Sequence, residues 1–167
     1  PYAYLASTQI NKLAAETQTE IEWVPMLLGG VFRAQQAPQV PAAHMSPAKA
    51  RMNTLDLERW ARRWDVPFSF SAHHPQRSVE AMRLLCITPP SLRPQVSAAL
   101  FNLYWVEQKR LDQSALEEVA IQFNLLEYWL QHRDEAKQLL FSNTEQAVSF
   151  GIFGAPALEI DGRIFWG

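Results

Sequence analysis

The chain has one cysteine and six glycines among its 167 residues, a net charge of only −2, and no long apolar run. A single cysteine excludes an internal disulfide, a CxxC redox pair and a cysteine-rich metal site. It is also typical of a reducing compartment, so we expect a cytoplasmic protein. The near-zero charge gives no electrostatic reason to expect nucleic acid or an anionic membrane as a partner. No stretch approaches the about 20 apolar residues of a membrane span, and no signal peptide is visible in the first residues.

The residues that often carry chemistry are sparse. Cys86 lies in the apolar run Leu84-Leu85-Cys86-Ile87, so we expect it to be buried and inert. His73 and His74 are adjacent on a segment expected to be extended, where neighbouring side chains point to opposite sides. No acidic or cysteine ligand is near them in sequence, and we predict no metal site.

Hydrophobic spacing and capping signals predict a chain that is mainly helical, with short strands near its two ends. The predicted helices cover 3–18, 46–64, 78–86, 92–108, a segment opened by a capping box at Ser114, 125–130 and 134–150. A strand is predicted at 20–28, ended by Gly29-Gly30 and followed by a long loop over 31–45. Residues 157–160 and 163–166 form a predicted hairpin through Asp161-Gly162, a dipeptide that a type I′ turn prefers. Strands at both ends with helices between them indicate one small sheet interrupted by a helical insertion.

The segment Phe153-Gly154-Ala155-Pro156, which enters the hairpin, is the strongest candidate for a binding site. A proline directly before a strand forces the preceding residue into an extended conformation. We predict that the Ala155–Pro156 bond is cis, which turns the N–H and C=O of Ala155 away from the sheet. Such free backbone groups bind an extended ligand as an added strand would.

Several short segments occur in an order that resembles one enzyme family. They are Pro1-Tyr2-Ala3-Tyr4-Leu5-Ala6, Leu28-Gly29-Gly30-Val31-Phe32-Arg33, Asp56-Leu57-Glu58-Arg59-Trp60-Ala61, Phe101-Asn102-Leu103-Tyr104-Trp105-Val106-Glu107, Gly151-Ile152-Phe153-Gly154-Ala155-Pro156 and Phe165-Trp166-Gly167. Together they resemble the 2-hydroxychromene-2-carboxylate isomerases, relatives of the kappa-class glutathione transferases. The resemblance implies an α/β fold in which a thioredoxin-like domain (1–45 and 134–167) is interrupted by an all-helical insertion (46–133). It also implies a homodimer that binds glutathione.

The resemblance further implies roles for individual residues. The residues expected to bind glutathione are Lys49, Gly154, Ala155, Pro156 and Trp166, and those expected to bind an aromatic substrate are Tyr2, Phe32, Arg33, Tyr104 and Trp105. Each of these aromatic rings could instead pack in the core, and for Tyr104 and Trp105 that interpretation is the favoured one. The family's serine that holds the glutathione sulfur would stand immediately before Pro1, and a polar segment would follow Gly167. No catalytic residue is therefore assigned here, and we expect the sequence to be part of a longer chain.

The resulting hypothesis is a glutathione-dependent isomerase of aromatic hydroxy acids like 2-hydroxychromene-2-carboxylate. The glutathione thiolate would add to a conjugated double bond and then leave, favoured by the positive end of the helix that begins near Pro1. Three alternatives stay open. They are a kappa-like glutathione transferase acting on another electrophile, a DsbA-like thiol–disulfide oxidoreductase with a cysteine before Pro1, and a non-catalytic binding module.

Overall fold

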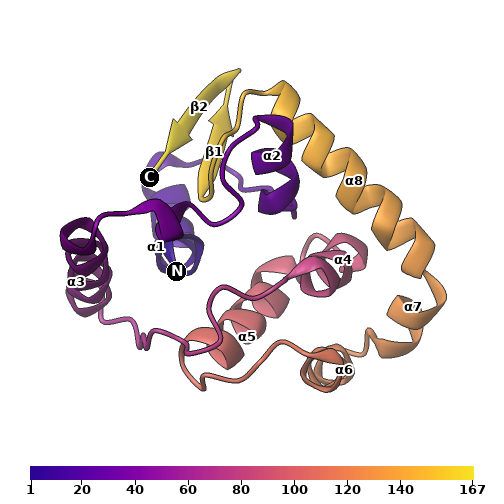
Figure 1. The fold of residues 1–167 in the computed structure, drawn as a ribbon. Coiled ribbons are helices and arrows are strands. Elements are labelled where there is room, and N and C mark those ends of the chain that lie inside the picture. Colours follow the sequence, from indigo (N-terminus) through magenta and orange to yellow (C-terminus); the bar gives the residue numbers. More distant parts are fainter.

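A computed structural model describes residues 1–167 as a mainly helical fold with one two-stranded sheet (Figure 1). The elements in chain order are α1 (Tyr2–Thr17), α2 (Leu28–Ala34), the 3₁₀ helix η1 (Pro41–His44), α3 (Pro47–Arg63), α4 (Val79–Ile87), α5 (Arg93–Trp105), α6 (Gln113–Gln122), α7 (Leu126–Gln131), α8 (Arg133–Ser149), β1 (Ala157–Ile160) and β2 (Arg163–Trp166). The predicted fold class, a small sheet with a large helical insertion, is confirmed.

Local sequence signals set most of these boundaries correctly. Ser46 caps α3 by accepting a hydrogen bond from the backbone N–H of Lys49 at 3.3 Å, and Pro47 occupies the first turn. In the hairpin, Asp161 and Gly162 have φ of 50° and 77°. These positive values are the ones that a type I′ turn needs, so the predicted turn is confirmed.

The predicted strand over 20–28 is wrong. The segment has the expected alternation, since Ile21, Trp23 and Pro25 are more buried than their neighbours, but it pairs with no strand. Its backbone is held by side chains instead, because Arg93 donates to Trp23 O at 3.0 Å and Asn143 donates to Pro25 O at 3.0 Å. Alternating burial predicts an extended chain, whereas a strand also requires a hydrogen-bonded neighbour.

The predicted loop over 31–45 is also wrong, because this segment contains part of α2 and the whole of η1. Gly29 and Gly30 lie inside α2 instead of ending a strand. Pro41 begins η1, where a missing N–H costs no hydrogen bond. Glycine and proline are thus compatible with these short helices and do not by themselves indicate irregular structure.

The start of α6 needs a smaller correction. The N-cap is Asp112, whose Oδ1 accepts a hydrogen bond from the N–H of Ala115 at 3.1 Å, and the capping box predicted at Ser114 does not form. Aspartate is as good a cap as serine, so a capping motif two residues along was mistaken for the helix start.

Three buried clusters hold the elements together, and α8 takes part in two of them. The largest has 14 residues from α4 to α8, including Trp129, which is fully buried, and Ala136 of α8. A second joins α1, α3 and α5 around Leu5, Leu57 and Trp105. A third packs Val31 of α2 against Ala147 of α8 and Ile152. Figure 1 shows α8 running from α7 to the hairpin, past α4 and α2. No helix is both long and apolar enough to cross a bilayer.

Helix α2 approaches α8 so closely that a side chain at one glycine would collide. A Cβ at Gly30 would lie 2.8 Å from Cγ2 of Thr144, whose hydroxyl accepts from Leu27 N and donates to Leu140 O. We expect Gly30→Ala to lower the free energy of unfolding by about 1–3 kcal/mol, measured by urea denaturation. Gly29→Ala is the control, because its Cβ would meet only the exposed Gln39 side chain.

A second substitution at the same contact should restore part of the stability that Gly30→Ala removes. Thr144→Ser removes the methyl group that collides and keeps the hydroxyl, so Gly30→Ala should cost less in a Thr144→Ser background. Equal losses in the two backgrounds, or equal effects of Gly29→Ala and Gly30→Ala, would contradict the close contact.

Candidate functional site

The beginning of α1 is the first part of the candidate site. Pro1 O accepts the hydrogen bond of Leu5 N at 3.0 Å, and the free N–H groups of the first turn give this end of the helix a positive partial charge. The Tyr2 hydroxyl donates to Oδ1 of Asn53 on α3. Burial raises the pKa of Tyr2, the bond to Asn53 lowers it, and the charge of Asp56 raises it. These contacts fix the beginning of α1 against α3.

Lys49 lies one helical turn before Asn53, so the two residues share a face of α3. Lys49 is exposed, and its ammonium group forms no ion pair or hydrogen bond within the protein. The face of α3 that contacts the beginning of α1 therefore also carries a cation with no partner.

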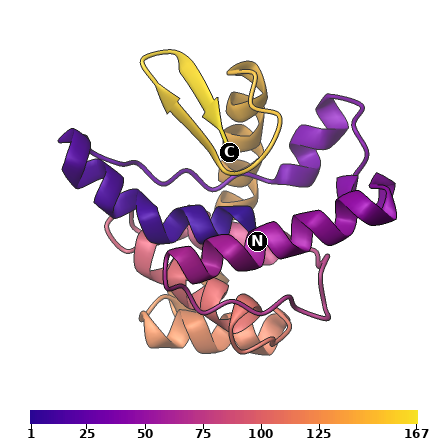
Figure 2. The ribbon, with the colours of Figure 1, turned by 90° about the vertical axis from the view of Figure 1, so that its left-hand side faces the viewer.

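The chain that enters β1 is the second part of the site. The Ala155–Pro156 bond is cis, as predicted. Ala155 is half-buried, and neither its N–H nor its C=O forms a hydrogen bond within the protein. The Trp166 indole covers Gly154, where an added Cβ would lie 2.4 Å from Nε1, and it packs against Phe153 with ring centroids 5.0 Å apart. Figures 1 and 2 both place the start of β1 on the side of the molecule where α1 begins.

An aromatic group around His74 is the third part. The His74 ring lies 5.1 Å from that of Trp105, 5.5 Å from Phe70 and 6.2 Å from Tyr104, between centroids. Burial lowers the pKa of His74. Tyr104 and Trp105, which the imidazole contacts, are buried in one cluster with Tyr4 and Leu5 of α1.

Tyr104 contributes a buried polar atom to this aromatic group. The residue is 7% exposed, and its hydroxyl has no hydrogen-bond partner. Burial raises the pKa of Tyr104, and the Ser71 side chain and Arg110 oppose that rise. The hydroxyl thus lies near the Ser71 side chain without meeting hydrogen-bond geometry.

The structure gathers some of the predicted site residues and separates others. Tyr2, Tyr104 and Trp105 lie around α1, with Tyr104 and Trp105 buried in one cluster with Tyr4 and Leu5. Phe32 and Arg33 lie on α2, and Arg33 lines a different cavity, together with Arg83 and Lys137. Sequence reasoning assigned none of Asn53, Ser71 and His74 to a site. The His73-His74 pair is visible in the sequence, where it predicts no metal site, but nothing local indicates that His74 contacts Tyr104 and Trp105.

The single cysteine lies apart from these groups. Cys86 is buried near the end of α4, and Nδ2 of Asn143 is 3.9 Å from its sulfur. Burial raises the pKa of its thiol to about 11, although the charge of Arg93 opposes the rise. A thiol with this pKa is not a thiolate near neutral pH, so Cys86 supplies no nucleophile.

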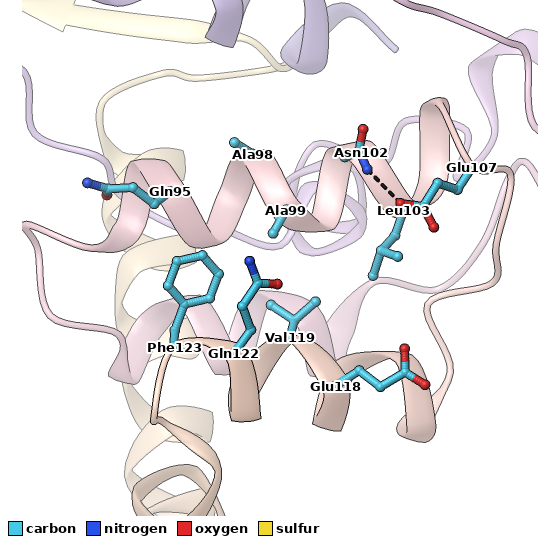
Figure 3. Close-up of a pocket in the computed structure, with 10 residues that line it drawn as sticks. All are labelled: Gln95, Ala98, Ala99, Asn102, Leu103, Glu107, Glu118, Val119, Gln122 and Phe123. Atoms are coloured by element: carbon cyan, nitrogen blue, oxygen red, sulfur yellow. Dashed lines mark hydrogen bonds between the residues drawn. The ribbon is translucent and has the colours of Figure 1, made fainter.

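A cavity of about 490 Å³ between α5 and α6 contains none of the predicted site residues (Figure 3). Its polar side chains bond mainly to one another or to close neighbours. Nδ2 of Asn102 donates to Oε1 of Glu107 at 2.7 Å, and Lys109 pairs with the other oxygen of Glu107 at 2.8 Å. We assign it no role.

The small sheet with its large helical insertion and the cis proline before β1 are those of a thioredoxin-like protein, and comparison with known families agrees with this class. The family profile described as the DSBA-like thioredoxin domain matches residues 1–167, so the chain belongs to that family. The predicted relationship to 2-hydroxychromene-2-carboxylate isomerases and kappa-class glutathione transferases is confirmed.

Two relatives and one solved structure illustrate the relationship. The chain is 28% identical to the 2-hydroxychromene-2-carboxylate isomerase of Sphingobium xenophagum, over 100% of this chain and 87% of that one. It is 26% identical to glutathione S-transferase kappa 1 of Caenorhabditis elegans, over 96% of this chain and 76% of that one. The structure of a 2-hydroxychromene-2-carboxylate isomerase superposes with a TM-score of 0.80 at 22% identity and covers 100% of this chain and 83% of that one. This last likeness shows the shared fold, and the relatives together indicate an enzyme.

The environment of His74 predicts a pH dependence of stability. Its pKa is lowered in the folded protein from an ordinary value of 6.5, so the unfolded chain takes up the proton first as the pH falls. The free energy of unfolding should therefore decrease as the pH falls through 6.5 toward the lower folded value. His74→Gln should reduce this decrease in urea denaturation at pH 7.5 and pH 5.

His73→Gln serves as the matched control, because His73 is exposed where His74 is half-buried. It should leave the pH dependence as in the unchanged protein. A pH dependence that responds equally to both substitutions would mean that the aromatic group does not favour the neutral imidazole.

Proposed function

We propose that the protein is a glutathione-dependent isomerase of aromatic hydroxy acids similar to 2-hydroxychromene-2-carboxylate. The observation that carries the proposal is the pair of unbonded backbone groups at Ala155, on the side of the molecule where α1 begins. The names of the relatives, an isomerase and a glutathione transferase, support the same chemistry.

The groups at this site fit a small acidic peptide such as glutathione. Ala155 offers one donor and one acceptor to a peptide backbone, in the way a strand edge does. Gly154 and Pro156 hold that backbone in place, and the Trp166 indole forms the adjoining wall. Lys49 has no partner in the protein and is free to pair with a carboxylate. When bound, glutathione would supply the thiolate that adds to the substrate and leaves it.

The protein's own contribution to that chemistry is electrostatic. The positive end of α1 lowers the free energy of an anionic sulfur placed near it. The Tyr2–Asn53 hydrogen bond keeps α1 and α3 in fixed relation, so that the charge of the helix end and the Lys49 cation act at one place.

An aromatic substrate would contact the ring of Tyr2, which is 42% exposed at the beginning of α1. Phe32, half-buried on α2, is a second candidate ring from a different helix. Tyr104 and Trp105 are buried in one cluster with Tyr4 and Leu5, and in this proposal they support the beginning of α1 from behind. Arg33 lines a separate cavity, together with Arg83 and Lys137.

Binding of glutathione is the first test. Reduced glutathione titrated calorimetrically into the protein should bind in the micromolar to low millimolar range. Lys49→Gln should weaken binding roughly 5-fold, about the value of one exposed ion pair. Arg51→Gln is the matched control, since Arg51 lies two positions further along α3, on the opposite side of the helix. Absence of binding would contradict the proposal and leave a thioredoxin-like scaffold with a different ligand.

Turnover separates the isomerase from its alternatives. With 2-hydroxychromene-2-carboxylate as substrate, we expect chromatography to show isomerised product while the concentration of free glutathione stays constant over many turnovers. Stoichiometric loss of glutathione to a conjugate would favour a kappa-like transferase, and formation of glutathione disulfide would favour a thiol–disulfide oxidoreductase. Glutathione binding with no reaction would favour a binding module.

Two further parts of the proposal concern assembly and location. We propose a homodimer, for which the exposed aromatic side chains Phe153, Phe165 and Trp166 around the hairpin offer apolar surface. We also propose a cytoplasmic location, which suits a single buried thiol with no disulfide partner.

A further inference from the structure

A cavity between α2, α4 and α8 is separate from the groups around the beginning of α1. Its volume is about 570 Å³, which is in the range of small-molecule sites in proteins. Neither Ala155 nor Trp166 lines it, and no residue of α1 does. Its lining combines cationic and apolar side chains, so the position of each charge decides which ligand the cavity can hold.

Helices α4 and α8 run side by side in the same direction along this cavity. Nη1 of Arg133, at the start of α8, is 3.4 Å from Oε2 of Glu80, at the start of α4. Further along both helices, Nδ2 of Asn143 is 3.9 Å from Sγ of Cys86. Residues that lie midway between these two contacts on the two helices are therefore neighbours.

Arg83 lies midway between the two contacts on α4, and Lys137 lies close to the midpoint on α8; both line the cavity. Lys137 is exposed and forms no ion pair or hydrogen bond within the protein. Nη1 of Arg83 donates to Glu80 at 2.6 Å, which leaves Nη2 of Arg83 without a partner. The end of the cavity between α4 and α8 thus offers free donors from two neighbouring helices. We call it the cationic end.

The cationic end has a net charge of +2. Glu80 is its acidic group and is shared between Arg83 and Arg133, so that with Lys137 there are three positive charges and one negative charge. A carboxylate brings only one negative charge. A phosphate monoester carries a charge of about −1.5 to −2 at pH 7 and has three strong acceptor oxygens. A phosphate monoester therefore matches the cationic end in charge.

Arg33 lies at the other end of the cavity. Gly30 of α2 packs against Thr144 of α8, and the Gln35 side chain, further along α2, bonds to the backbone just after α8. Arg33 therefore lies beside the last turns of α8, roughly 10 Å along the helix axis from the cationic end. Glu145, which directly follows Thr144, lines this same end and offsets the charge of Arg33.

An exposed aromatic ring borders the cationic end. Phe141 lies one turn after Lys137 on α8 and is 66% exposed, although phenylalanine is among the residues most often buried. The other large apolar side chains of the lining are Leu27, Val79, Leu140 and Val148. A flat group attached to a phosphate would displace water from this surface favourably.

We propose that the cavity binds a phosphate monoester with a flat body, of the class of nucleoside monophosphates. Arg83 and Lys137 contact the phosphate oxygens, and Phe141 packs against the base. Arg33 lies too far along α8 to contact the phosphate. The proposal does not rest on the glutathione-dependent activity, because it uses neither the residues of that site nor a carboxylate ligand.

Calorimetric titration with adenosine 5′-monophosphate (AMP) tests the proposal, with adenosine and cyclic AMP as analogues. Adenosine keeps the flat body without a charge, and cyclic AMP is a phosphodiester with a single negative charge. We expect saturable binding of AMP at one site. Adenosine should bind roughly 10-fold more weakly and cyclic AMP roughly 3-fold more weakly, because each loses charge-assisted hydrogen bonds.

Substitutions at the two ends of the cavity separate the cationic end from Arg33. Lys137→Gln should weaken AMP binding roughly 5-fold, and Lys137→Glu more strongly, because the new carboxylate repels the phosphate. Arg83→Lys, which keeps the charge beside Glu80 and loses the second donor group, should weaken it roughly 3-fold. Arg33→Gln is the matched control in the same cavity and should leave the affinity for AMP unchanged. Circular dichroism of each variant confirms that the fold is kept.

Several results would contradict the proposal. Absence of saturable AMP binding, an affinity for adenosine or cyclic AMP equal to that for AMP, or equal losses in Lys137→Gln and Arg33→Gln would each overturn it. Saturating reduced glutathione should leave the affinity for AMP unchanged, and competition would overturn the proposal by assigning AMP to the site near α1. The isomerase is measured by turnover without AMP, so failure of one proposal leaves the other standing.

Discussion

Two adjacent side chains of α8 hold the chain that connects α1 to α2. Asn143 donates to Pro25 O, and Thr144 accepts from Leu27 N, so the segment between the helices is fixed without any strand pairing. The Thr144 methyl group also sets the distance to α2, because only a glycine at position 30 leaves room for it. Since α8 continues directly toward the hairpin, the position of Ala155 depends on the same packing. A few atoms of one helix thus connect the helical core to the candidate site.

Much of the candidate site could be predicted from the sequence because its residues lie at turns and helix ends, which short local motifs indicate. The Ala155–Pro156 dipeptide, the Asp161-Gly162 turn and the Ser46-Pro47 helix start are all short signals whose physical cause lies within a few residues. Asn53 and His74 could not be found in this way. Asn53 matters because α3 crosses the beginning of α1 (Figure 2), and His74 because its loop returns to Tyr104 and Trp105. The His73-His74 pair is visible in the sequence, but both of these contacts are long-range and do not follow from a local pattern.

Four features followed from the sequence alone: the helical majority, the hairpin with its turn, the inert cysteine and the family resemblance. Each of them depends on local periodicity or on ordered motifs. The tertiary structure decided what depends on neighbours. It decided that residues 20–27 pair with no strand, and that position 30 in α2 must be a glycine, since Thr144 of α8 lies against it. It also decided that Arg33 joins Arg83 and Lys137, since hydrogen bonding and packing bring together helices far apart in the chain.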